Sequence, residues 1–260
     1  MSGAEDNKLR YSIVVPVFNE AENIAPFCRK ALDELPARYE LLICYDFEED
    51  STLPALAGLR DIDKPSRLRF IRNELGPGVR YAIEAGMRTA EASVILVMMA
   101  DISDDFGAVE EMVSKVEQGA DVVCASRYMR GGKQIGGPWL KGLLSRAAGL
   151  SLHWLTGLPT HDPTNSFKAY RREFIERTTI ESAAGFALGI ELTVKAHFNG
   201  GRVEEVPATW YDRAAGESRF RLWKWIPLYL HWYVWAIKRK CLGYPHSLKS
   251  SPLGSHAPLS

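Results

Sequence analysis

Short apolar runs alternate with amphipathic stretches along the first half of the chain. The apolar runs cover residues 11–17, 39–45, 67–71, 93–99 and 120–125. Each is nearly continuous, which is typical of strands that are buried on both faces of a sheet. The segments between them, such as 20–35 and 106–118, space their apolar residues as helices do. This alternation predicts an α/β fold with a mostly parallel sheet flanked by helices.

Polar residues that follow the apolar runs are the candidates for chemistry, because ligands bind beyond the carboxyl ends of parallel strands. Asn19 and Glu20 follow the first run, where Asn19 could cap the next helix and Glu20 would lie in its first turn. Four carboxylates follow the second run, and Asp46 is the first and best placed of them. The other three could be solvated loop charges or caps for a helix that begins near Ser51.

Two further strand ends carry charged residues. Asp101, Asp104 and Asp105 follow the fourth run, and Asp101 at the rim of the sheet suits a hard cation with oxygen ligands. Asp104 or Asp105 could instead cap a helix that begins near Phe106. The fifth run leads to Arg127 and then to the basic, glycine-rich segment GGKQIGG, so this guanidinium is a candidate phosphate binder.

Residues 219–240 combine four tryptophans with basic residues at both ends. This composition is typical of an amphipathic helix seated among lipid headgroups, and we expect such an interfacial helix here. The longest apolar stretch, 222–237, is interrupted by polar residues and is shorter than the roughly 20 residues that a spanning helix needs. A helix packed on the domain or on a partner is the alternative. Residues 241–260 are rich in Pro, Ser and Gly, and we expect a disordered tail.

Composition narrows the function classes. The 260 residues suffice for one large α/β domain, expected at 1–218, followed by the interfacial helix and the tail. The 32 basic and 32 acidic residues give no net charge, which argues against a nucleic-acid binder. The four cysteines form no CxxC pair, so we expect free thiols in a reducing compartment. Because the N-terminus lacks the apolar core of a signal peptide, we expect a cytoplasmic protein that associates peripherally with the membrane.

Six segments, taken in order, resemble the motifs of glycosyltransferase family 2. They are VVPVFNEAENI, YDFEEDST, MADISDD, ASRY, HDPTNSFKAYRR and VPATWYDRAAGESRF. Together they cover residues 11–220 and resemble the dolichol/polyprenyl-phosphate mannosyltransferase-like group. The resemblance implies a Rossmann-like GT-A fold and an inverting, metal-dependent glycosyltransferase. Its donor would be a UDP- or GDP-sugar, its acceptor a polyprenyl-phosphate-type lipid at the cytoplasmic membrane face, and a membrane partner could help to anchor it.

The resemblance also implies roles for individual residues. The nucleotide site would be lined by Pro16, Phe18, Glu20 and Asp46. Mg²⁺ or Mn²⁺ would be held by Asp101 and Ser103. The acceptor phosphate would be bound by Arg127, Lys141, Ser145 and Arg213, in a loop supported by Ser218 and Arg219. Within this set, the catalytic residues would be Asp101, Arg127 and Arg213.

The chain departs from the family pattern at two motifs. Met99 stands at the first Asp of the D-x-D metal motif, and Tyr45 replaces an Asp of the second motif. A catalytically inactive nucleotide-sugar-binding subunit is therefore one alternative. The other is a family 2 enzyme that acts on a glycan or polysaccharide hydroxyl, which would need a carboxylate base. The candidate bases are Asp104, Asp105 and Asp162.

Overall fold

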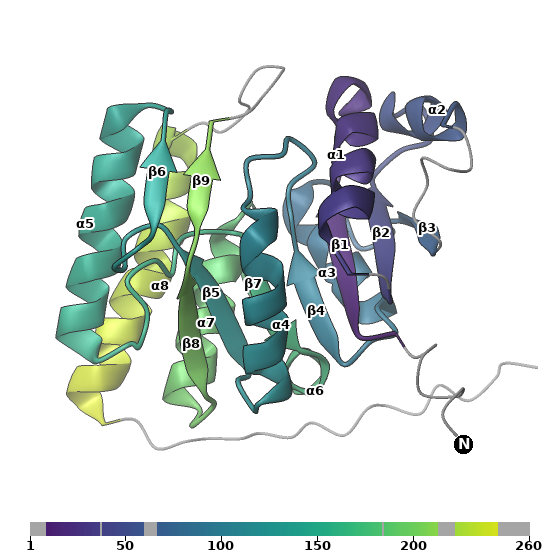
Figure 1. The fold of residues 1–260 in the computed structure, drawn as a ribbon. Helices are drawn as coiled ribbons and strands as arrows, with labels where there is room; N and C mark the ends of the chain where they lie inside the picture. The colour runs from purple at the N-terminus through teal and green to yellow at the C-terminus, as the bar shows by residue number, and fades with distance from the viewer. Residues whose placement is uncertain (1–8, 37, 60–66, 184, 213–221, 244–260) are drawn as a thin grey trace, which may run out of the picture.

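The predicted strands form the central sheet of the computed structural model, which describes residues 9–36, 38–59, 67–183, 185–212 and 222–243 (Figure 1). The five predicted strands are confirmed as β1 (Tyr11–Pro16), β2 (Tyr39–Tyr45), β3 (Leu68–Arg72), β4 (Val94–Val97) and β5 (Val122–Ser126). Two more strands, β7 (Lys168–Arg171) and β8 (Val203–Pro207), complete a sheet of order β3-β2-β1-β4-β7-β5-β8. Only β7 is antiparallel to its neighbours in this sheet, so the mostly parallel α/β class is confirmed.

Helices cover both faces of the sheet, because successive residues of a strand point to opposite sides. Ile13 and Val15 of β1 belong to the core on one face, and Val14 between them belongs to the core on the other. The first face is covered by α1 (Ala21–Glu34), α2 (Thr52–Ala57) and α4 (Val109–Glu117). The second is covered by α3 (Val79–Thr89), α6 (Arg172–Arg177) and α7 (Ala187–Phe198). Figure 1 shows α1 and α4 on the near face of the sheet.

One glycine sets how closely α3 approaches the sheet. A Cβ on Gly86 would lie 2.5 Å from Cγ1 of Val14 and 2.6 Å from Sγ of Cys44. Side chains of the sheet therefore fill the space that any larger residue would need. Cys44 is buried in this contact, as are Cys28 and Cys124 elsewhere, and all the cysteines of the described residues are free thiols, as expected.

A second, smaller layer stands beside the sheet, on the left in Figure 1. It contains the parallel pair β6 (Lys133–Ile135) and β9 (Thr209–Tyr211), and the helices α5 (Trp139–Thr156) and α8 (Leu222–Leu242). α8 packs against the domain through Trp232 and Ala236, which are buried with residues of α5 and α7. Nε1 of Trp232 donates a hydrogen bond of 2.9 Å to Oγ of Ser182.

The packing of α8 bears on the expected interfacial helix. The alternative of a helix packed on the domain is confirmed for the face that carries Trp232. Contact between another face of α8 and a membrane stays a prediction. Within the described part of the chain, no helix is long and apolar enough to cross a bilayer.

Candidate functional site

The predicted donor residues follow three neighbouring strands. β1 pairs in parallel with β2 on one side and with β4 on the other. Because parallel strands end at the same edge of a sheet, the segments carrying Glu20, Asp46 and Asp101 begin side by side. The topology thus brings the three predicted carboxylates to one edge.

The loop after β1 is locked to the loop after β2 by Asn19 and Asp50. The backbone N–H of Asn19 lies 3.0 Å from each carboxylate oxygen of the buried Asp50. In return, Oδ1 of Asn19 accepts a hydrogen bond of 3.1 Å from the backbone N–H of Ser51. The prediction that Asn19 caps the next helix is therefore wrong, because its side chain bonds the other loop and Glu20 occupies the N-cap position. Asn19 adopts a φ of 57°, a left-handed conformation that asparagine tolerates better than most residues.

Phe18 and Glu20 lie on either side of Asn19 in the chain. The Phe18 ring is exposed and meets the Phe47 ring edge to face at 5.4 Å between centroids. Oε2 of Glu20 accepts a hydrogen bond of 2.6 Å from the side chain of Asn23, and the backbone N–H of Glu20 donates to Oγ1 of Thr52. An exposed aromatic face beside a carboxylate suits a nucleoside, which stacks through its base and donates hydrogen bonds through its ribose hydroxyls.

Asp46 fastens the end of β2 to the loop before α3. Its carboxylate accepts hydrogen bonds from Nδ2 of Asn73, at 2.8 Å, and from the backbone N–H of Gly78, at 2.7 Å. Gly78 has a φ of 108°, which favours glycine. Each carboxylate oxygen has two lone pairs, so these bonds leave capacity for a ligand. The loop that contains Gly78 therefore helps to position Asp46.

The acidic cluster after β4 divides into three environments. Asp101 is half-buried, and its Oδ1 accepts from the backbone N–H of Ser103 at 3.1 Å. Asp104 is buried and accepts from the backbone N–H of Met99 at 2.8 Å. Burial raises the pKa of Asp104 to about 8, although the Met99 N–H opposes this shift. Asp105 caps the short 3-10 helix at Phe106–Ala108 through the N–H of Gly107, which confirms the capping prediction for this residue.

The residues at this edge fit a divalent cation that is completed by a diphosphate. No group of three His, Cys, Asp or Glu residues within the described ranges could hold a metal ion by itself. Mg²⁺ is commonly bound by one or two carboxylates together with substrate phosphates and water. A half-buried Asp101 at the strand end matches that pattern, and Ser103, which is itself buried, holds the carboxylate in place through its N–H.

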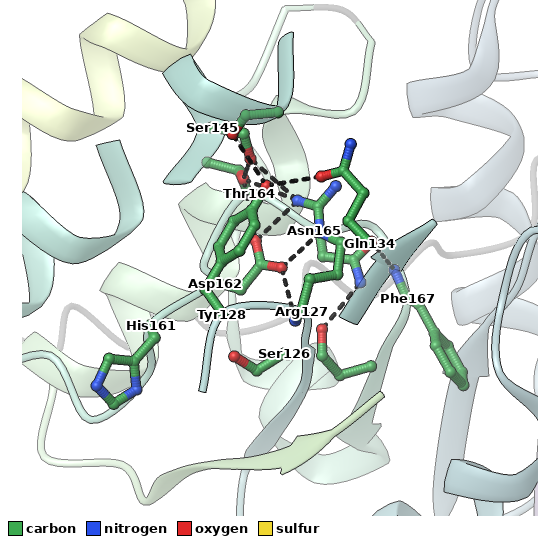
Figure 2. Close-up of polar contacts among 12 residues, drawn as sticks. Ser126, Arg127, Tyr128, Gln134, Ser145, His161, Asp162, Thr164, Asn165 and Phe167 are labelled. Carbon is green, nitrogen blue, oxygen red and sulfur yellow. Dashed lines mark hydrogen bonds and ion pairs between the residues drawn. The ribbon is translucent and has the colours of Figure 1, made fainter. Parts of the chain in front are cut away.

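Arg127, at the end of β5, forms a buried ion pair with Asp162 (Figure 2). Nε of Arg127 lies 2.7 Å from Oδ2 of Asp162, and Nη2 lies 2.9 Å from Oδ1. The two side chains are 9% and 0% exposed. Burial alone would raise the pKa of Asp162, but the Arg127 guanidinium outweighs it and holds that pKa below its usual value. Burial likewise opposes the charge of Arg127, whose pKa is raised because the Asp162 carboxylate prevails.

The ion pair extends to α5. Nη2 of Arg127 also donates to Oγ of Ser145 at 3.0 Å, and that hydroxyl shares a hydrogen bond of 2.7 Å with Oγ1 of Thr164 (Figure 2). Two predicted acceptor residues, Arg127 after β5 and Ser145 on α5, are therefore in direct contact. Lys141 lies one turn before Ser145 in α5, with Nζ 6.0 Å from the centroid of the Trp210 ring.

Three predicted residues lie outside the described residues: Arg213, Ser218 and Arg219. The others are placed at two neighbouring regions of the molecule, the β1-β2-β4 edge and the end of β5 with α5. Pro16 is the last residue of β1 and is buried, so it shapes the first region through the backbone.

Sequence reasoning missed the residues that hold Arg127. It treated Asp162 only as a candidate base, whereas both oxygens of Asp162 bind Arg127. It also gave no role to Lys168, which is fully buried in β7 and donates from Nζ to the carbonyl oxygens of Pro163 and Asn165. These bonds fix the segment that follows Asp162. The signal was the motif HDPTNSFKAYRR, in which Asp162 and Lys168 lie six positions apart.

Comparison with known proteins agrees with this geometry. Residues 12–179 match the model of the family described as glycosyl transferase family 2. Polyprenol monophosphomannose synthase from Mycolicibacterium smegmatis is 31% identical over 216 residues, which cover 81% of this chain and 80% of that protein. Dolichol-phosphate mannosyltransferase from Pyrococcus furiosus is 27% identical over 218 residues, which cover 82% of this chain but only 60% of that protein.

Solved structures support the fold. Glucosyl-3-phosphoglycerate synthase from Mycobacterium tuberculosis, in complex with Mn²⁺, UDP and glucosyl-3-phosphoglycerate, superposes with a TM-score of 0.62 at 18% identity. The match covers 93% of this chain and 82% of that one. The family match spans more than half of the chain, and the ordered motifs lie at the strand ends where that family's chemistry is expected. The chain therefore belongs to glycosyl transferase family 2 and is a glycosyltransferase.

Proposed function

We propose that this enzyme transfers a sugar from a UDP- or GDP-sugar to a polyprenyl phosphate, with inversion at the anomeric carbon, at the cytoplasmic face of a membrane. The observation that carries the proposal is the buried Arg127–Asp162 pair, which holds a guanidinium fixed beside Ser145 on α5. A guanidinium fixed in this way is suited to binding a phosphate group. The two named relatives, a polyprenol monophosphomannose synthase and a dolichol-phosphate mannosyltransferase, support this acceptor class.

The donor would lie along the β1-β2-β4 edge. We assign the base to Phe18, with Pro16 shaping this part of the site through its backbone, and the ribose and base polar groups to Glu20 and Asp46. Asp101, oriented by Ser103, would hold Mg²⁺ or Mn²⁺, which when bound stabilises the negative charge of the leaving diphosphate. The Mn²⁺ and UDP in the M. tuberculosis synthase structure support a divalent ion together with a nucleotide diphosphate in this fold.

The acceptor phosphate would attack the anomeric carbon of the sugar directly. One phosphate oxygen forms the new bond to that carbon while the bond to the nucleoside diphosphate breaks. A phosphate monoester has a second pKa near 6 and is mostly dianionic at neutral pH, so the reaction needs no strong general base. The enzyme's task is to hold two anionic groups together. The hydrogen bonds among the described residues use Nε and Nη2 of Arg127, and we assign Nη1, with Ser145, Lys141 and Arg213, to the acceptor phosphate.

A glycan hydroxyl is a weaker candidate acceptor because each candidate base is already engaged. Asp162 is paired with Arg127, and Asp105 accepts from the backbone N–H groups of Gly107 and Thr209. Asp104 is buried and bonded to the N–H of Met99. Asp104 and Asp162 are buried and therefore not placed as solvent-facing bases, and both oxygens of Asp105 accept backbone hydrogen bonds. Met99 remains the strongest feature in favour of an inactive subunit.

A transfer assay tests the proposal. The purified full chain is incubated with radiolabelled UDP- or GDP-sugars and a short-chain polyprenyl phosphate, with Mg²⁺, Mn²⁺ or EDTA. We expect a lipid-linked product with one donor, dependence on the metal, and no product with the matched polyprenol, which lacks the phosphate. NMR of the anomeric proton should show inversion. Transfer to the polyprenol or to a glycan would refute the phosphate acceptor, and nucleotide binding without turnover under every condition would indicate the inactive subunit.

We propose that the enzyme associates peripherally with the membrane surface, where a membrane-anchoring partner would help to hold it. Fractionation of cells under low and high salt tests this: salt-sensitive recovery with membranes is the expected result, and recovery only in the soluble fraction at low salt would contradict it.

A further inference from the structure

The outer face of α5 is apolar and faces solvent. Trp139, Leu143 and Trp154 are 77%, 56% and 79% exposed, and they recur at spacings that place them on one stripe of a helix. The opposite stripe, with Gly149, Leu152 and Thr156, is buried against the domain. Soluble domains usually keep exposed tryptophans and leucines apart, and a continuous apolar patch marks an interaction site.

The segment of the chain that contains α5 carries only positive charge. No Asp or Glu occurs between Asp121 and Asp162, a stretch that contains five Lys and Arg residues. Arg130, Lys133 and Arg146 of this stretch are exposed. Exposed aromatic and aliphatic side chains with basic residues beside them are complementary to an anionic bilayer surface, which attracts the cations and accepts the apolar groups.

Trp232 of α8, in contrast, belongs to the protein interior. Trp232 is only 3% exposed, donates a hydrogen bond to Ser182 and packs with α5 and α7. Its ring is therefore part of the packed core. The tryptophans of α5 at positions 139 and 154 are left in solvent.

We propose that the outer face of α5 is the surface by which this enzyme binds the headgroup region of an anionic phospholipid bilayer. The proposal deepens the proposed function, and rests on it for the identity of the acceptor. Ser145 lies on α5 and contacts Arg127. A helix with its side chains is about 10 Å across, and an interfacial helix sinks about 5–10 Å into the headgroup boundary. A phosphate at headgroup depth would thus lie close to the Arg127 side of the helix.

Vesicle flotation with matched variants tests this surface. The full chain is mixed with vesicles of phosphatidylcholine alone or with phosphatidylglycerol, and binding is measured over a range of lipid concentrations. The variant Leu143→Glu/Trp154→Glu removes two exposed apolar groups from α5. The control Leu230→Glu/Val234→Glu removes two exposed apolar groups from α8. Far-UV circular dichroism and thermal melts show that each variant is folded.

We expect the wild-type chain and the α8 control to bind the anionic vesicles. The α5 variant should bind on the order of a hundred-fold more weakly, because it loses two apolar side chains and each contributes about one order of magnitude when buried. Equal binding by the α5 variant, a loss confined to the α8 variant, or no binding by the wild type would overturn the proposal. In the last case, light scattering that shows dimers lost in the α5 variant would identify a second copy as the occupant.

Activity separates this proposal from the proposed function. With a short-chain polyprenyl phosphate in detergent, the α5 variant should retain wild-type turnover, while transfer to a long-chain acceptor in vesicles should fall with binding. Vesicle binding through α5 without transfer to any polyprenyl phosphate would leave the surface in place and refute the function. If the α5 variant transfers sugar at the wild-type rate both in detergent and in vesicles, the membrane-binding surface is refuted and the proposed function stands.

Discussion

The buried ion pair between Arg127 and Asp162 can be tested by replacing one charge. In Asp162→Asn the side chain keeps its size and one acceptor oxygen, but the Arg127 guanidinium loses its counter-charge in a site where both side chains are almost fully buried. Removing one partner of a buried pair costs about 3–5 kcal/mol, because the remaining charge is left uncompensated. We therefore expect the free energy of unfolding to fall by about 3 kcal/mol at pH 7.

The effect should depend on pH in a defined direction. The pKa of Asp162 is held below its usual value in the folded protein. A carboxylate of this kind stabilises the folded state above its unfolded pKa, and that stabilisation is lost as the pH falls through the folded pKa. The difference between wild type and Asp162→Asn should thus be full at neutral pH and shrink below about pH 4.

Urea unfolding followed by circular dichroism measures the change, with Glu173→Gln as the control. Glu173 is an exposed carboxylate on α6, so its neutralisation should change the free energy of unfolding by no more than about 0.5 kcal/mol. The double variant Arg127→Met/Asp162→Asn should be less destabilised than the sum of the two single changes, since the partners are in contact. A loss below about 1 kcal/mol in Asp162→Asn, or additive single changes, would refute the role given to this pair.

Four further outcomes are expected. Asp101→Ala should abolish metal-dependent turnover without changing the thermal melt, and unchanged activity would remove Asp101 from the metal site. Arg213→Ala should raise the acceptor KM or lower turnover far more than it weakens donor binding, as measured by nucleotide titration. The stability of the wild type relative to Asp104→Asn should decline as the pH rises from about 4 to about 8, because Asp104 has a folded pKa of about 8 and keeps a proton that the unfolded chain releases. This decline exceeds about 1.4 kcal/mol if the folded and unfolded pKa values differ by more than one unit. Trp232→Ala should lower the free energy of unfolding by about 3–5 kcal/mol in a urea titration, and a change below about 1 kcal/mol would contradict the packing of α8.

Five strands of the sheet could be predicted because an apolar run marks each of them. β1, β2, β4 and β5 are buried along their whole length, so their sequences are continuous runs. β8 reads VEEVP and only Val203 and Val206 are buried, so no such run marks it. β7 lies inside the sheet yet contains the buried Lys168, whose charge is compensated by backbone carbonyls that a pattern does not reveal.

The sequence predicts which residues belong to the site, but it does not predict which residues they contact. A strand-end position is visible in the sequence, which is why Asp101 and Arg127 were identified. The contact of Arg127 with Asp162 joins residues 35 positions apart, and the lock between Asn19 and Asp50 joins residues 31 apart. Composition also cannot separate a tryptophan that binds lipid from one that packs in a core, because both environments accept an apolar ring. Exposure separates Trp154 from Trp232.

The charge of the proposed acceptor site follows from this pairing. Asp162 neutralises Arg127 at 2.7 Å, so the pair supplies directed N–H donors but little net positive potential toward a dianion. Its contribution to acceptor binding is therefore geometric: it fixes the guanidinium beside Ser145. Further positive charge is therefore needed to balance a phosphate dianion. Lys141 and Arg213 are the assigned residues with that charge, and the exposed cations around α5 add a longer-range attraction that is screened by salt.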